Sequence, residues 1–402
     1  MSEHRLEVAD VFRIHEDDFL AQWGQVLSRE QRKAFADIRD CRTAALGGHV
    51  EQFDCGHRVP VYNSCANRSC PKCQSAARAK WLAERGAELL PVDTYFHVVF
   101  TLPQEITHLA LQNAREIYRI LFRAASETLM TIAADPKHLG AEIGFLAVLH
   151  TWGQNLHIHP HIHCVVPGGG ISKDGSHWIA PRKKSFFLPV KVLGCLFRKK
   201  FLIYLKKAFR KGKLRFHGEL KPLAEPSVFA ALCDKADQRK WVVYAKRPFG
   251  GPEQVLKYLA RYVQRVAISN SRLLSLEAGR VTFEWKDYAD GNQSKTMTLD
   301  AVELIRRFLL HVLPSGFVRI RHFGFLANRN RAEKLALCRS LLPARQTAAE
   351  PTASSAGDCD TKTGEQEPRR CPICKVGRLV FIEVLTAEAL ACLQAPMIAD
   401  TS

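Results

Sequence analysis

The sequence has no apolar run long enough to cross a bilayer. Its longest apolar stretches, such as FHVVFTLP (residues 96–103) and IGFLAVL (residues 143–149), fall far short of the ~20 residues that a bilayer requires. The first residues, MSEHRLEVADVFRIHEDD, are charged and lack the apolar core of a secretory signal. These absences exclude a transmembrane or secreted protein and predict a cytoplasmic one with no membrane partner.

Acidic residues are scarce relative to basic ones. The 402 residues include 58 Lys and Arg against 40 Asp and Glu, so the formal net charge is +18. Hydrophobic residues make up 47%, which is ordinary for globular domains with a sizeable core. A cationic surplus of this size favours a polyanionic partner, with nucleic acid as the first candidate. The alternative is a cationic enzyme that is otherwise ordinary.

The cysteines are numerous for a reducing compartment, and they cluster. There are 13 in the chain, and metal ligation is a more common role for them there than disulfide formation. Cys70-Pro-Lys-Cys73 has the spacing at which two thiolates bind one structural zinc. The second pair is expected from Cys55 with Cys41 or His49, and Cys65 belongs to this site or to another one. Buried free thiols are the alternative.

A second Cys-x-x-Cys pair, Cys371 and Cys374, lies near the C-terminal end of the sequence. Only Cys359 and Cys392 lie near it, so no partner pair is evident. The pattern leaves a second zinc site open.

The stretch LHIHPHIHCVVPGGG, residues 156–170, carries a histidine at every second position. Residues two apart on a strand share one face. Pro160 removes a backbone N–H, so we expect the strand to begin at His161. His161 and His163 then form a two-imidazole platform suited to a catalytic divalent metal with open coordination positions. His157 and His159 are candidates for a third ligand or an outer contact, and a solvent-exposed face of histidines is the alternative.

A helix is predicted over EQVLKYLARYVQRVA, residues 253–267. At 100° per residue, Tyr258 and Tyr262 lie together at the border of its apolar stripe, beside a row formed by Lys257, Arg261 and Arg265. The tyrosine hydroxyls are candidate nucleophiles toward a phosphodiester, and the basic row is a candidate DNA-binding surface. The alternative is that the tyrosines only bury their rings.

In this order, the motifs resemble the HUH endonucleases of the two-tyrosine class. With the CRTAALGGH…CG…YNSC…CPKCQ cluster, YFHVVFTLP and GFLANRNR, the chain resembles a zinc-binding, rolling-circle insertion-sequence transposase from about residue 41 to about residue 342. The resemblance implies an α+β fold, with an antiparallel sheet, packed helices and the histidine strand at its centre. Strand 94–103 would be the neighbouring strand.

The resemblance also implies a chemistry. Such enzymes cleave single-stranded DNA at element ends through a 5′-phosphotyrosine link, and Tyr258 and Tyr262 match the two nucleophiles. His161 and His163 match the pair that holds Mg²⁺ or Mn²⁺, with His157, His159 or His97 as the third ligand. Zn²⁺ would be structural.

Four segments are expected: a helical and zinc-binding module (residues 1–90), a catalytic domain (91–344), a linker (345–370) and a small Cys-x-x-Cys module (371–402). Three other functions compete with the transposase. They are a zinc-containing DNA-binding protein without chemistry, a rolling-circle replication initiator, and a transposase that uses three acidic residues. The first and third would leave the histidine strand unexplained. The sequence gives no indication of oligomeric state.

Overall fold

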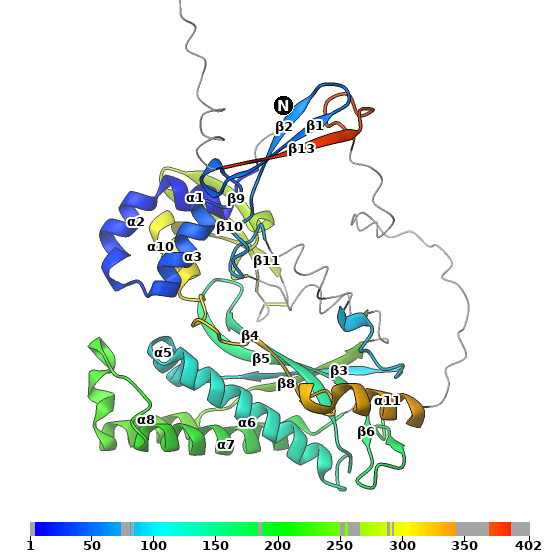
Figure 1. The fold of residues 1–402 in the computed structure, drawn as a ribbon. Coiled ribbons are helices and arrows are strands. Elements are labelled where there is room, and N and C mark those ends of the chain that lie inside the picture. The colour runs from blue at the N-terminus through cyan, green and yellow to red at the C-terminus, as the bar shows by residue number, and fades with distance from the viewer. Residues whose placement is uncertain are drawn as a thin grey trace, which may run out of the picture.

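An antiparallel sheet of five strands lies at the centre of the protein (Figure 1). The structure is a computed structural model that describes residues 5–73, 81, 84–183, 187–249, 254–255, 266–287, 290–291, 293–342 and 370–386. The strand order is β12-β4-β5-β3-β8, so the histidine strand β5 occupies the middle position. The strands are β3 (Tyr95–Thr101), β4 (Gly144–Trp152), β5 (Ile158–Pro167), β8 (Val243–Phe249) and β12 (Ile320–Gly324).

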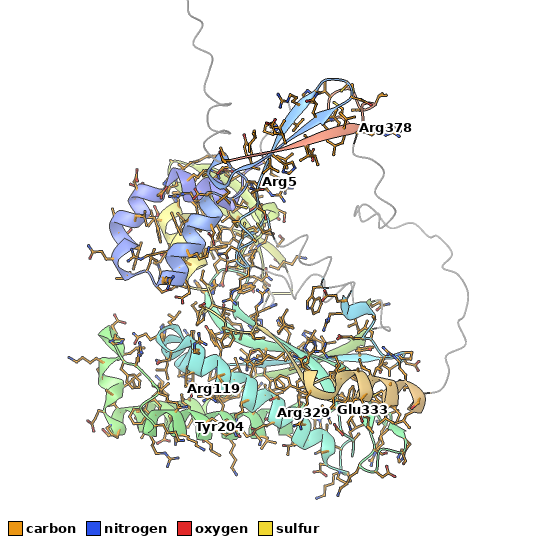
Figure 2. All side chains as sticks on the ribbon, viewed as in Figure 1. Arg5, Arg119, Tyr204, Arg329, Glu333 and Arg378 are labelled. Atoms are coloured by element: carbon orange, nitrogen blue, oxygen red, sulfur yellow. The ribbon has the colours of Figure 1, made fainter. Side chains whose placement is uncertain are left out.

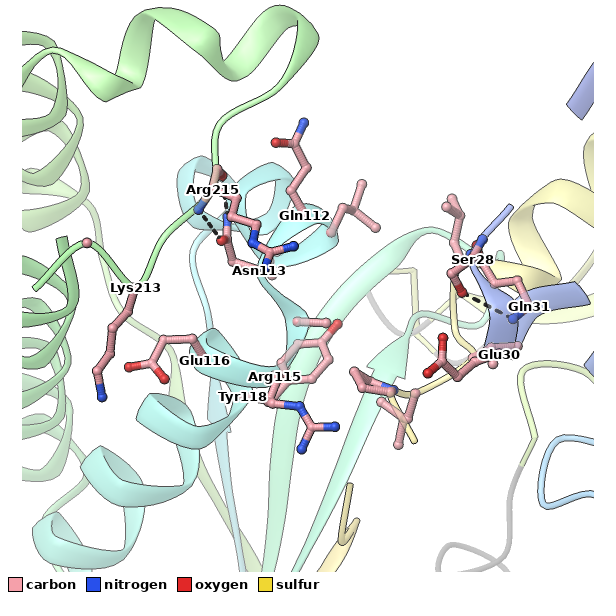
Figure 3. Close-up of a pocket in the computed structure, with 18 residues that line it drawn as sticks. Ser28, Glu30, Gln31, Gln112, Asn113, Arg115, Glu116, Tyr118, Lys213 and Arg215 are labelled. Carbon is pink, nitrogen blue, oxygen red and sulfur yellow. Dashed lines mark hydrogen bonds between the residues drawn. The ribbon is translucent and has the colours of Figure 1, made fainter. Parts of the chain in front are cut away.

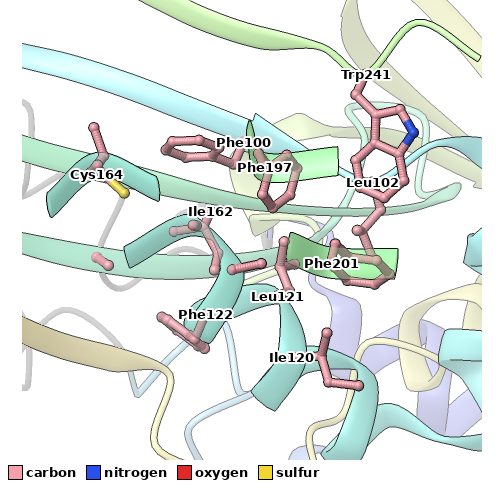
Figure 4. Packing of buried hydrophobic residues seen from close by; sticks show 14 of the residues in the cluster. Phe100, Leu102, Ile120, Leu121, Phe122, Ile162, Cys164, Phe197, Phe201 and Trp241 are labelled. Carbon is pink, nitrogen blue, oxygen red and sulfur yellow. The ribbon is translucent and has the colours of Figure 1, made fainter. Parts of the chain in front are cut away.

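Helices cover one face of this sheet: α5 (Gln104–Gln112), α6 (Ala114–Ala134), α7 (Val190–Arg210) and α8 (Pro226–Gln238). Alternate strand residues, among them Phe100, Ile162 and Cys164, pack against α6 and α7 in the largest hydrophobic core (Figure 4). Period-two alternation on the strands and period-3.6 spacing on the helices bring these apolar faces together. The antiparallel sheet with packed helices that the sequence predicts is confirmed.

The opposite face of the sheet carries the histidines. A smaller apolar cluster on this face includes Leu146, Val148 and Val165 from β4 and β5, with Val255 and the helix α11 (Arg331–Leu341) packed on them. The short strands β6 (Gly170–Ile171) and β7 (Trp178–Ile179) form a hairpin beyond β5. The sheet is therefore covered on both faces, and the histidines lie on this second face beside the apolar cluster.

The N-terminal helices pack with residues from the other half of the chain. Their core joins α1 (Val8–Ile14), α2 (Glu16–Trp23) and α3 (Arg29–Arg39) to β9 (Leu273–Glu277), β10 (Arg280–Asp287), β11 (Gln293–Asp300) and α10 (Ala301–Leu309). Leu156, in the loop between β4 and β5, is buried in the same core with a φ of 63°. The loop beside the histidines is thus anchored in this second core.

A three-stranded sheet, which we call the arm, joins distant parts of the chain (Figure 1). It contains β1 (Gly48–Phe53), β2 (Arg58–Tyr62) and β13 (Leu379–Leu385), with β1 in the middle and antiparallel to both neighbours. Residues 371–402 were expected to form a separate module, whereas β13 completes an N-terminal sheet. Among the described residues, no helix is long and apolar enough to span a membrane.

Candidate catalytic and metal sites

Three histidines converge on the polar face of the central sheet. His150, His161 and His163 each offer a ring nitrogen, and these nitrogens all lie within 4.8 Å of one another. His161 and His163 share a face of β5, and His150 on β4 lies directly opposite His161 in the antiparallel register. Three imidazoles at this spacing can bind one divalent cation. His150 was not among the residues predicted from the sequence.

The strand that carries these histidines begins earlier than expected. β5 starts at Ile158, so Pro160 lies inside it, and not before it. The pairing with β4 is irregular between His150 and Trp152, at the level of Pro160, and an irregularity of this kind tolerates a residue without an N–H. On the other side, the carbonyl of Pro160 accepts from the Leu102 amide at 3.1 Å.

Hydrogen bonds orient two of the three rings. Nδ1 of His161 lies 2.6 Å from the carbonyl oxygen of His159, to which it donates. Nδ1 of His163 lies 2.8 Å from Nε2 of His97, and the two rings stack with their centroids 5.0 Å apart. Bonds of this kind fix a ring's tautomer and direct its other nitrogen, Nε2, toward a metal.

The three residues proposed as third ligand have other positions. His97 is buried at 1% exposure on β3 and contacts His163 from outside the group. His157 and His159 are exposed, and neither belongs to the group. His159 contributes its backbone carbonyl instead.

The histidine group is suited to ligation at neutral pH. Burial, together with the neighbouring His159, lowers the pKa of His161 to about 4. A neutral imidazole keeps the lone pair that a metal needs. At neutral pH the His161 imidazole is therefore unprotonated and free to bind a cation.

The tyrosines and their basic row lie outside the described residues: Tyr258, Tyr262, Lys257, Arg261 and Arg265. Val255, at the beginning of that segment, is described and fully buried. It packs in the cluster with Val148 and Val165, which lie beside the histidines on the same face of the sheet.

Four cysteines of the N-terminal segment form a closed group. The sulfurs of Cys41, Cys65, Cys70 and Cys73 lie within 4.8 Å of one another, with Cys73 3.4 Å from Cys41 and 3.6 Å from Cys65. Zn–S bonds of about 2.3 Å in a tetrahedron place sulfurs about 3.8 Å apart, so the spacing fits one zinc ion. The Cys70 thiol, which bonds to Cys41, holds the pKa of the Cys41 thiol well below its usual value.

The assignment of Cys55 to this first site needs correction. Cys41, Cys65, Cys70 and Cys73 form a group of four without it, and Cys55 lies instead with Cys371 and Cys374 at the far end of the arm. His49 lies in β1, where it contacts Glu51, and belongs to neither group. The partner of the second Cys-x-x-Cys pair therefore comes from the N-terminal hairpin.

A separate cavity of about 760 Å³ lies between the start of α3 and the α5–α6 junction (Figure 3). Two of its polar side chains hold the surrounding backbone: Asn113 exchanges hydrogen bonds of 2.7 and 2.9 Å with the Arg215 backbone, and Ser28 caps α3. No histidine or cysteine lines it. The cavity therefore lacks the imidazoles and thiols that form the histidine and cysteine groups.

Two family models match this chain. One family model, "Transposase zinc-binding domain", matches residues 11–102, and another, "Putative transposase", matches residues 144–334. The first spans the four-cysteine group and the second spans the three histidines.

Two relatives match over most of their length. The "Putative transposase y4qJ" of Sinorhizobium fredii is 56% identical over 382 residues, covering 94% of this chain and 95% of that one. The "Transposase for insertion sequence element IS801" of Pseudomonas savastanoi pv. phaseolicola is 29% identical over 304 residues, covering 72% and 68%. The metal-bound "Conjugative Relaxase Trwc In Complex With Orit DNA" matches 79% of this chain and 96% of that chain, at 13% identity and a TM-score of 0.24, too low to carry an inference.

These matches define the class of the protein as a transposase with an N-terminal zinc-binding domain. Within that class the chain belongs to the family that its motifs resemble, the zinc-binding, two-tyrosine HUH transposases of rolling-circle insertion sequences. The family predicted from the sequence is confirmed.

Proposed function

We propose that this transposase nicks and rejoins single-stranded DNA at the ends of its own element by metal-assisted tyrosine transesterification. The observation that carries the proposal is the group of His150, His161 and His163 on the face of the sheet where Val255 is buried. Tyr258 and Tyr262 follow Val255 by three and seven residues. Even an extended chain therefore keeps their Cα atoms within about 11 and 25 Å of it.

The histidine group favours Mn²⁺ over Mg²⁺. Mg²⁺ prefers an octahedron of oxygens, whereas imidazole nitrogen suits the softer transition metals. The bound cation would polarise a phosphate oxygen at the scissile bond. His150, His161 and His163 would hold it, and His97 and the His159 carbonyl would keep two of the rings in place.

In the proposed reaction a tyrosine replaces a 3′-oxygen on phosphorus. The hydroxyl oxygen of Tyr258 or Tyr262 forms a bond to phosphorus and gives up its proton, the bond from phosphorus to the 3′-oxygen breaks, and the 3′-oxygen takes up a proton. A 3′-hydroxyl then attacks the phosphotyrosine to rejoin DNA. The bond count is conserved, so no external energy source is needed.

Cations would hold the strand during these steps. The helix predicted from the sequence places a basic row beside the tyrosines, formed by Lys257, Arg261 and Arg265. Each contact of such a cation with a phosphate adds affinity for DNA, and this affinity falls as the salt concentration rises. The net charge of +18 agrees with a polyanionic substrate.

The test is a denaturing gel of the full chain with labelled single-stranded DNA from its element's end, with and without Mn²⁺. We expect a metal-dependent, protein-linked band that the Tyr258→Phe/Tyr262→Phe double variant loses. Tyr244→Phe is the matched control, because Tyr244 lies on the same face of the sheet in β8 and is 52% exposed. DNA retarded on a native gel without any covalent band would instead favour a binding protein without chemistry.

A companion variant tests the metal. His161→Ala/His163→Ala should remove cleavage and Mn²⁺ binding together. Metal-dependent cleavage that persists in this variant would mean that the cation binds elsewhere.

A further inference from the structure

Three thiols at the far end of the arm belong neither to the four-cysteine group nor to the histidine site. Cys55 lies in the turn between β1 and β2, and Cys371 and Cys374 lie in the loop that leads into β13. Their sulfurs lie within 4.8 Å of one another, and all three are free cysteines. Figure 2 labels Arg378 at this end of the arm, away from the central sheet.

The two loops are fitted closely to each other. The Asp54 amide donates to the Arg378 carbonyl at 2.9 Å, and the Arg378 amide donates to Oδ1 of Asp54 at 3.0 Å. A Cβ on Gly377 would lie 2.8 Å from the Cys55 sulfur, closer than such contacts occur, so only glycine allows this approach. Hydrogen bonds and close packing between two distant segments therefore hold the three sulfurs together.

The loop of Cys371 and Cys374 is shaped for ligation. The Lys375 amide donates to the Cys371 carbonyl at 2.9 Å, and the Gly377 amide donates to the Cys374 sulfur at 3.2 Å. An N–H directed at sulfur stabilises the thiolate, which is the form that binds metal. Lys375 holds the tight turn with a φ of 60°.

Packing alone contributes little to holding β13 in place. Its outward apolar side chains Val380, Ile382 and Val384 are 59%, 52% and 83% exposed. Arg58 and Glu383 form an ion pair at 3.0 Å, and both side chains are exposed to solvent. Exposed ion pairs stabilise a fold by less than about 1 kcal/mol. A strand that buries so little surface needs another source of free energy, and a metal site supplies it in small modules.

We propose that Cys55, Cys371 and Cys374 bind a second zinc ion, which clamps β13 to the N-terminal hairpin. Solvent reaches Cys55 and Cys374, while Cys371 is buried at 1% exposure, so water can complete the tetrahedron. The proposal is independent of the tyrosine chemistry.

Zinc content provides the first test. The full-length protein, purified in a phosphine reductant, should retain about two zinc ions per chain after dialysis. Cys371→Ser/Cys374→Ser should retain about one, and so should Cys55→Ser. The triple variant should also retain about one zinc ion, because all three cysteines bind the same ion. Cys195→Ser, which changes an exposed cysteine of α7, is the control and should retain both. A variant with the wild-type zinc content would overturn the proposal.

Alkylation of the wild type needs no variant and so is unaffected by misfolding. Cys55, Cys374 and Cys195 are all exposed, and all three should react quickly with iodoacetamide if none holds a metal. With the proposed zinc bound, Cys55 and Cys374 should be protected until a chelator is added, whereas Cys195 reacts at once in both samples. Equal labelling of the three before chelation, or a disulfide between Cys55 and Cys374 under reducing conditions, would contradict the proposal.

Discussion

Replacing His97 with phenylalanine isolates the hydrogen bond that orients His163. The ring of His97 is buried, stacks on that of His163 with an interplanar angle of 8°, and makes a bond of 2.8 Å from Nε2 to Nδ1 of His163. Phenylalanine preserves the stacked ring and removes the bond. Loss of such an outer contact costs a metal site about 10- to 100-fold in affinity. The expected loss is therefore about 1.4 to 2.8 kcal/mol of Mn²⁺ binding free energy.

The measurement is a Mn²⁺ titration of wild type and His97→Phe, followed by electron paramagnetic resonance and by the rate of DNA cleavage. Both readouts should shift to higher Mn²⁺ by the same factor, while cleavage at saturating metal is largely restored. His217→Phe, an exposed histidine before α8, is the control. Equal Mn²⁺ affinity in His97→Phe and wild type, with the variant folded by circular dichroism, would refute the role assigned to His97.

Four further outcomes are expected. His150→Ala should raise the Mn²⁺ concentration needed for half-maximal cleavage by at least about tenfold, because even the loss of an outer contact costs a metal site about that much affinity. DNA retardation on a native gel should be unchanged. Cys41→Ser should release the first zinc and lower the melting temperature, since Cys41 is buried in the core of the N-terminal helices. Gly324→Ala should lower the free energy of unfolding by about 2 kcal/mol or more, seen as a lower urea midpoint, because φ is 59° there and a Cβ would lie 1.7 Å from the Ile143 carbonyl oxygen. Burial lowers the pKa of His311 to about 4 from an ordinary 6.5, so as pH falls from 6.5 to 4 the unfolded chain takes up a proton that the folded chain does not. Across that window the wild type should lose up to about 3 kcal/mol more stability than His311→Gln, measured by urea denaturation.

The histidine strand was predictable because its information is local. Alternation at period two places His161 and His163 on one face whatever the rest of the chain does, and both belong to the group in the structure. Cys70 and Cys73 are a similar case, since two residues between cysteines suffice to bring the sulfurs to one ion. The zinc-binding family could be predicted from the order of such motifs.

The other members of these groups come together through long-range geometry. His150 meets His161 through the register of β4 on β5, which the irregularity beside Trp152 sets, and no local pattern reveals that offset. Cys55 meets Cys371 and Cys374 only because β13 pairs with β1 from the other end of the chain. Such pairings need the fold itself.

The most direct test of the central claim is to identify the amino acid that becomes linked to DNA. Wild-type protein would be incubated with Mn²⁺ and single-stranded DNA from its element's end, digested with protease, and the nucleotide-bearing peptide sequenced by mass spectrometry. The proposed function predicts a phosphodiester on Tyr258 or Tyr262. Linkage to any other residue, such as Tyr244 or a serine, would contradict it.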